Sequence, residues 1–284
     1  MADMNVLKTR ELGYGFIPPE YLPDGKNEYY LRNRQVGKPA KHWRKLRSDE
    51  RDALIAAGNR SDNWPDVRVA DGFNPAYVRG CEFVGLVRLG RLGNVSLSMH
   101  GLAMPVGLVD SRIVSSDIGD NVVIHNVRHL SHMIVGNNVM LLNIDELHTS
   151  GCAKFGNGIV KDGEDESVRI AMDLINEAGG REVLPFDGMT PGDAYLWARY
   201  RGDKPLMNRL RDITQSQCEL RRGVYGEIGA GSVIKHCRII KDVRIGPAAY
   251  IKGANKLKNL TINSSEAEPT QIGEGVELVT GIIG

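Results

Sequence analysis

The chain has 284 residues, of which 42% are hydrophobic and 25% charged, and its formal net charge is +1. Because the charge is nearly balanced, we expect no nucleic acid or other polyanion as a partner. The N-terminus has no apolar signal core, and no run approaches the ~20 apolar residues that span a bilayer, so no membrane association is expected. The four cysteines form no CxxC pair, which favours reduced thiols and a cytoplasmic location.

Residues 1–77 are predicted to form an irregular N-terminal arm with one short helix. Ser48 is a good N-cap for a helix over 49–58. The basic run 38–47 surrounds Trp43, but no nucleic-acid-binding motif accompanies it. We therefore expect a solvated arm that packs Trp43 onto the body of the protein.

Residues 78–284 carry a repeat that predicts stacked short strands. Large aliphatic residues between 118 and 147 recur at spacings of 6, 6, 5, 6 and 6, and the same signature returns between 228 and 262. An α-helix or a long alternating strand does not have this period, but a short strand, a turn and another short strand would. Internal repetition of this kind predicts a mainly β solenoid with a 17-residue coil.

The coil length predicts which side chains stack. Residue n lies on residue n+17, about 4.8 Å away in the sheet. Two inward columns are expected: Ile113 with Leu130 and Leu147, and Gly107 with Ile124 and Leu141.

Residues 161–226 interrupt the repeat. Apolar spacing and capping residues predict a helical insertion of roughly three helices, over 164–180, 191–200 and 204–215. The repeat resumes at Ile228, restarts again at Ile272 and then stops. Because such a stop leaves an open strand edge and an uncapped core, we expect the natural protein to continue beyond residue 284, or a partner to cover this end.

The outward positions of the coil supply a candidate catalytic pair. Arg112, His129 and Glu146 share one outward column. A carboxylate one strand from an imidazole can orient it and raise its basicity, so His129 is the candidate base and Glu146 its orienting group.

The candidates for substrate binding surround this column: Arg112, Arg128, Asp145, His148, Lys154 and Asn157. The two arginines are suited to a phosphate or carboxylate. The insertion leaves after Ile159 and is expected to overhang the column and form a cleft. The alternative is a ladder of opposite charges that only decorates a solvent face.

Metal and nucleotide motifs are weak in this sequence. Strand alternation would put His125 and His132 on different faces, so we predict no metal site. The chain has no P-loop, no complete GxGxxG and no GxSxG nucleophile motif.

Five units of the repeat resemble hexapeptide repeats: IGDNVV (118–123), VGNNVM (135–140), IGAGSV (228–233), IGPAAY (245–250) and IGEGVE (272–277). Such repeats belong to the left-handed parallel β-helix superfamily, which includes trimeric sugar and amino-acid acyltransferases. Phrases such as CAKFGNG and DAYLW are also similar to an uncharacterised bacterial family of longer hexapeptide-repeat proteins, loosely associated with sugar-nucleotide pyrophosphorylases. The resemblance implies a left-handed parallel β-helix with a helical insertion, assembled as a homotrimer.

Two functional hypotheses follow. The first is a transferase that modifies a sugar or sugar nucleotide, with acyl transfer favoured and acyl-coenzyme A as the implied cofactor. The second is a non-catalytic β-helix that binds a ligand or serves in assembly, because the superfamily also holds subunits without activity.

Overall fold

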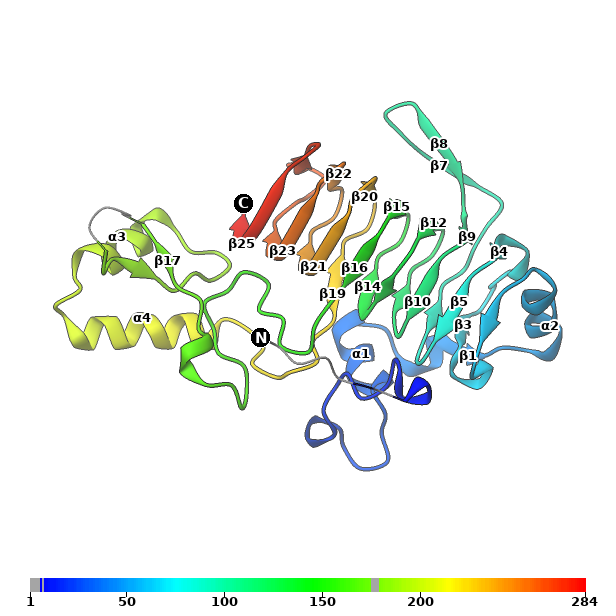
Figure 1. Cartoon of the computed structure of the whole chain (residues 1–284), viewed down its shortest axis with the longest axis horizontal. Helices are drawn as coiled ribbons and strands as arrows, with labels where there is room; N and C mark the ends of the chain where they lie inside the picture. Colours follow the sequence, from blue (N-terminus) through cyan, green and yellow to red (C-terminus); the bar gives the residue numbers. More distant parts are fainter. Residues whose placement is uncertain (1–5, 7, 175–178) are drawn as a thin grey trace.

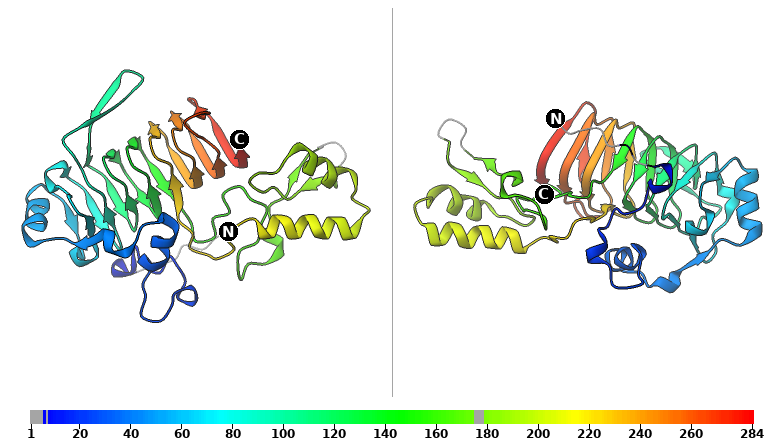
Figure 2. Two further views of the ribbon diagram at one scale, coloured as in Figure 1. Left: turned by 180° about the vertical axis from the view of Figure 1, so that it is seen from behind. Right: turned by 60° about the horizontal axis from the view of Figure 1, so that its bottom comes forward.

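The computed structural model describes residues 6, 8–174 and 179–284, and this part of the chain is mainly β. Short parallel strands stack in rows around one aliphatic core, and the N-terminal arm lies along one side of the stack (Figure 1). A separate lobe, formed by the insertion, lies beyond the C-terminal end of the stack in every view (Figures 1 and 2).

The strands form three parallel rows. Row 1 contains β2 (Arg60–Ser61), β5 (Glu82–Val84), β10 (Arg112–Val114), β13 (Leu130–Ser131) and β16 (Glu146–His148). Row 2 contains β3 (Arg68–Ala70), β6 (Arg88–Leu89), β11 (Asp117–Ile118), β14 (Met133–Val135) and β19 (Gly226–Ile228). Three longer strands bend around the corner and continue both rows: β21 (Ile239–Ile245), β23 (Lys256–Ile262) and β25 (Glu277–Ile283).

Row 3 is a separate sheet of β4 (Val78–Arg79), β9 (Gly107–Val109), β12 (Val123–Val127), β15 (Met140–Ile144), β20 (Val233–Lys235), β22 (Tyr250–Lys252) and β24 (Gln271–Ile272). Each turn of the chain visits rows 1, 2 and 3 in that order, so one coil contributes one strand to each row. The aliphatic side chains that face inward from the three rows make up the core.

The register confirms one predicted column and corrects the other. Ile113 lies opposite Leu130, which lies opposite Leu147, and all three are fully buried. Ile124, however, pairs with Leu108, so the prediction of Gly107 in that column is wrong by one residue. The coil between these two strands is therefore one residue shorter than the regular repeat.

Asn and His residues turn one corner of the coil. Asn126, Asn143 and His236 all have positive φ, between 52° and 56°, a conformation that Asn and His adopt more readily than most residues. Their side chains stack: Asn126 Nδ2 donates to Asn143 Oδ1 at 2.8 Å, as the 17-residue phase predicts, and Asn143 Nδ2 lies 3.3 Å from His236 Nδ1.

The arm is more regular than predicted. The expected short helix is α2 (Ser48–Ala56), but the arm also contains α1 (Tyr29–Val36), which ends at Gly37 in the left-handed conformation. Trp43 begins β1 (Trp43–Lys45), which pairs with β3, so the prediction that Trp43 packs onto the body is confirmed. Short 3-10 helices punctuate the chain at Thr9–Glu11, Pro19–Tyr21, Ala40–His42, Trp64–Asp66, Pro75–Tyr77 and Glu166–Val168.

The insertion has two α-helices in its described residues, α3 (Pro191–Arg199) and α4 (Lys204–Ser216). Thr190 and Asp203 cap them, as the sequence predicts. The helix predicted over 164–180 is wrong where the structure describes it: a 3-10 turn leads into the hairpin β17 (Met172–Asp173) and β18 (Glu182–Val183). Ile175 to Ala178, part of that prediction, lie outside the described residues.

The mainly β prediction is confirmed at this level: the sheets are curled and mostly parallel. The largest sheet also includes one antiparallel pair, β1 with β3, so it is mixed. The protruding hairpin of β7 (Ser96–Met99) and β8 (Leu102–Pro105) is a separate antiparallel sheet (Figure 1). The structure therefore does not show the regular left-handed hexapeptide β-helix that was expected. Within the described residues, every helix is too short or too polar to cross a membrane.

Candidate functional site

The predicted column forms as a stack, but its side chains pair differently. Arg112 Nε lies 3.1 Å from the carboxylate of Glu82, on the neighbouring strand. Glu146 lies 3.8 Å from His148 Nε2, and the rings of His129 and His148 are 6.2 Å apart. Burial lowers the pKa of both histidines, so both are neutral at pH 7. The carboxylate of Glu146 therefore contacts His148, two residues away on the same strand, rather than His129, for which the sequence predicted it.

The other predicted residues have structural contacts. Arg128 pairs with Asp145 at 3.4 Å across an exposed corner. Lys154 is buried; its Nζ donates to the Val168 carbonyl at 2.8 Å. Asn157 is buried as well. Its side-chain Nδ2 donates to the Lys154 carbonyl, and its Oδ1 accepts from Asp187 N. The two buried residues hold the base of the insertion together.

The insertion does not overhang the predicted column, so the predicted cleft is wrong. The insertion leaves between β16 and β19, which is the step from row 1 to row 2. The chain then follows this corner toward the C-terminal end of the stack: Gly156 N donates to Asn259 Oδ1, and the Phe155 carbonyl accepts from Thr261. The insertion therefore runs past the side of row 2 and does not approach Arg112 and His129.

A second outward column, on row 2, carries charges at the same spacing. In register along this row lie Arg88, Asp117, Ile134, Glu227 and Arg244. The first part of this column, Arg88 and Asp117, lies under α1. The last part, Glu227 and Arg244, faces a groove.

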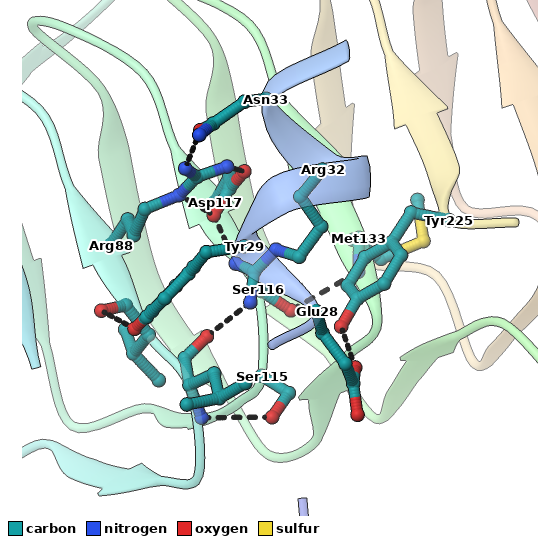
Figure 3. Close-up of polar contacts among 12 residues, drawn as sticks. Glu28, Tyr29, Arg32, Asn33, Arg88, Ser115, Ser116, Asp117, Met133 and Tyr225 are labelled. Atoms are coloured by element: carbon teal, nitrogen blue, oxygen red, sulfur yellow. Dashed lines mark hydrogen bonds and ion pairs between the residues drawn. The ribbon is translucent and has the colours of Figure 1, made fainter. Parts of the chain in front are cut away.

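Under α1 the charges form a closed network (Figure 3). Arg32 projects from α1, and its guanidinium and that of Arg88 both bind the carboxylate of Asp117. Arg32 also donates to the Leu86 carbonyl at 2.5 Å, and Arg88 donates to Asn33. Burial tends to raise the pKa of Asp117, but the two guanidinium groups hold it below its ordinary value. The network fixes α1 on the stack.

Two further contacts set the position of α1 along the row. Glu28 is buried and accepts from the Tyr225 hydroxyl at 3.2 Å (Figure 3). It also accepts from Phe16 N at 3.0 Å. Gln35, at the other end of the helix, donates to the Tyr225 carbonyl at 2.8 Å and to Glu227 Oε1 at 2.7 Å. These bonds join segments about 190 residues apart and bring the end of α1 beside β19.

Beyond these contacts two cavities adjoin, with Gln35 and Arg244 lining both. One has a volume of about 460 Å³ and runs along row 2 over a floor of glycine and aliphatic residues. The other, of about 340 Å³, is lined by Leu31, Arg34, Gln35, Glu219, Arg221, Val224 and Arg244. We call the two together the row 2 groove; their volumes lie in the usual range for small-molecule sites.

Three arginines line the smaller cavity. Arg34 comes from α1, Arg221 from the end of the insertion and Arg244 from β21. Arg244 lies over the ring of Phe155, 4.9 Å from its centroid. Nε of Arg244 and Nη1 of Arg221 are enclosed by protein atoms without a hydrogen-bond partner among the described residues, as is Nε of Arg32, Arg68, Arg112 and Arg222 elsewhere. Each guanidinium has further N–H groups, and these are the ones that could donate to a ligand in the cavity.

A fourth cation lies behind the smaller cavity. Lys161 is buried, and its Nζ donates to the carbonyls of Glu219 and Arg221 at 2.6 and 3.3 Å. The pKa of Lys161 is lowered to about 8, mainly because the amine is buried; Glu219 opposes this shift, and Arg244 and Arg221 add to it.

Sequence reasoning missed this groove, although one signal was available. The same 17-residue phase that stacks Arg112 on His129 also places Arg244 beside Glu227, across the point where the repeat resumes. The contributions of α1 and Arg221 could not be read in this way, because their positions depend on long-range packing.

Comparison with known proteins gives a family and one relative. A family model described as "Domain of unknown function (DUF4954)" matches residues 43–283. An uncharacterised protein of Treponema pallidum (strain Nichols) is 51% identical over 281 residues, which is 99% of this chain and 39% of that protein. The chain thus spans well under half the length of that relative.

These matches correct the expected membership of the hexapeptide-repeat acyltransferase superfamily and of its pyrophosphorylase-associated branch. Six-residue spacing reports how short parallel strands alternate with turns, and it does not identify a family. The chain belongs to the family described as Domain of unknown function (DUF4954).

Proposed function

We propose that this chain binds a small anionic ligand, without catalysing a reaction on it, in the row 2 groove. The observation that carries the proposal is that Arg34, Arg221 and Arg244 line one cavity. A guanidinium presents a planar set of N–H donors that matches the oxygens of a phosphate or carboxylate.

The charge balance of the smaller cavity supports the same conclusion. Its lining has three arginines and one carboxylate, Glu219, which lies 3.8 Å from Arg221 Nε. The excess positive charge is held in a partly desolvated cavity, where it acts more strongly than on an open surface.

The test is calorimetric titration of inorganic phosphate into the wild type and two variants. Arg244→Ala should weaken binding about ten- to hundredfold, because a hydrogen bond to a charged group contributes roughly 1.5–3 kcal/mol. Arg128→Ala removes an exposed arginine from another part of the stack and should leave the affinity unchanged. Absence of phosphate binding to the wild type, or equal affinities in all three proteins, would contradict the proposal.

A second candidate is acyl transfer from acyl-coenzyme A to a sugar or sugar nucleotide. The observation in its favour is the pair of neutral imidazoles on row 1, with Glu146 beside His148. His148 would accept the proton of a substrate hydroxyl, and Glu146 would stabilise the imidazolium. The test is release of free thiol from acetyl-coenzyme A with a panel of sugar nucleotides. Release that His148→Asn abolishes supports this candidate, and no release above background excludes it for that panel.

A further inference from the structure

The larger cavity of the groove differs in chemistry from the arginine-lined one. Its walls carry two carboxylates and three amides above a floor of glycine and aliphatic residues: Glu227, Asp187, Gln35, Asn137 and Asn263. Two cations, Lys38 and Arg244, also line it. A cavity of this kind offers hydrogen bonds to hydroxyl groups and an apolar surface to a carbon skeleton.

The two carboxylates flank Arg244. Glu227 lies one strand before it in register. Asp187 is held by Asn263, which follows β23, the strand after it. Each carboxylate has one oxygen in a side-chain hydrogen bond, Glu227 Oε1 with Gln35 and Asp187 Oδ1 with Asn263. The second oxygen of each remains able to accept from a ligand hydroxyl.

The lining of the larger cavity disfavours a nucleotide. None of the described residues that line the larger cavity is aromatic, so a nucleotide base would find no ring to stack on.

From this arrangement, and resting on the proposed function, we infer that the ligand is a phosphate monoester of a polyhydroxy compound, such as a sugar phosphate. The phosphate lies among Arg34, Arg221 and Arg244, and the hydroxyl-bearing body lies in the larger cavity. Asp187 and Glu227 recognise the hydroxyl groups.

The experiment compares inorganic phosphate, glucose, uridine 5′-monophosphate and a panel of sugar phosphates (glucose 6-phosphate, mannose 1-phosphate and myo-inositol 1-phosphate) by calorimetric titration. The tightest sugar phosphate should bind the wild type at least tenfold more tightly than inorganic phosphate or the nucleotide. Asp187→Asn should reduce the advantage of the sugar phosphate over inorganic phosphate to threefold or less. Arg244→Ala should weaken both.

The outcomes separate the two proposals. If inorganic phosphate binds but every sugar phosphate binds no more tightly, or if the nucleotide binds most tightly, the inference fails and the anion-binding function stands. If neither inorganic phosphate nor any sugar phosphate binds, both fail. An advantage for the sugar phosphate that survives in Asp187→Asn and in Glu227→Gln also overturns the assigned roles.

Discussion

The outward column of charged residues on row 2 has two parts, which carry similar charges in different surroundings. Arg88 and Asp117 lie under α1, where Arg32 completes a closed network. Glu227 and Arg244 lie on the same row, past the end of α1, and face a groove. The comparison shows that the charges of this column pair with one another where α1 covers them and line a groove where α1 has ended.

The largest expected effect comes from breaking the covered part. Asp117→Asn leaves Arg32 and Arg88 buried without a carboxylate, and loss of one member of a buried ionic group costs roughly 3–5 kcal/mol. We therefore expect the free energy of unfolding, measured by urea denaturation, to fall by about that amount.

The matched control is Asp145→Asn, which breaks the exposed pair with Arg128 and should cost at most about 1 kcal/mol. If both variants lost the same free energy of unfolding, burial under α1 would not be what makes the Asp117 pairs stronger than the Asp145–Arg128 pair.

A second prediction uses the buried cation beside the open part. The pKa of Lys161 is lowered by burial to about 8 in the folded protein, against 10.5 ordinarily. Between pH 8 and 10.5 the unfolded chain binds more protons than the folded protein, so stability rises with pH. The cost of burying the charged amine is at its full value below pH 8 and decreases over this range. Relative to Lys161→Met, the wild type should gain about 2 kcal/mol of unfolding free energy between pH 7.5 and 9.5. Parallel pH profiles for the two proteins would show that Lys161 titrates normally.

The smallest expected effect comes from altering the charge balance of the open part. Glu227→Gln removes a negative charge next to Arg244 but keeps an acceptor for Gln35. Inorganic phosphate should bind about two- to fivefold more tightly, since a nearby charge at the protein surface contributes up to about 1 kcal/mol. Calorimetry at two salt concentrations checks this, because the gain should shrink at high salt. Weaker binding by this variant would place the phosphate away from Arg244.

Much of the scaffold could be predicted from the sequence, because the repeat is local. The spacing of aliphatic residues gave the short parallel strands and the column of Ile113, Leu130 and Leu147. Gly107 was misplaced because one coil is a residue shorter, and counting along a fixed period cannot detect such a change.

The groove could be predicted only in part. The pairing of Glu227 with Arg244 follows from the repeat phase. The positions of Arg34 and Gln35 do not, because α1 is held by a buried network and by bonds to Tyr225, about 190 residues away. The insertion was expected over row 1, yet it leaves at the corner that leads to row 2, which placed the predicted cleft on the wrong face.

The most direct test of an anion site in the row 2 groove is anomalous diffraction from crystals soaked in tungstate, a heavy analogue of phosphate. We expect an anomalous peak within hydrogen-bond distance of the guanidinium groups of Arg221 and Arg244, and this peak should disappear when excess phosphate is added. A peak only at other positions, or none at a tungstate concentration that stabilises the protein in solution, would contradict the proposed anion site.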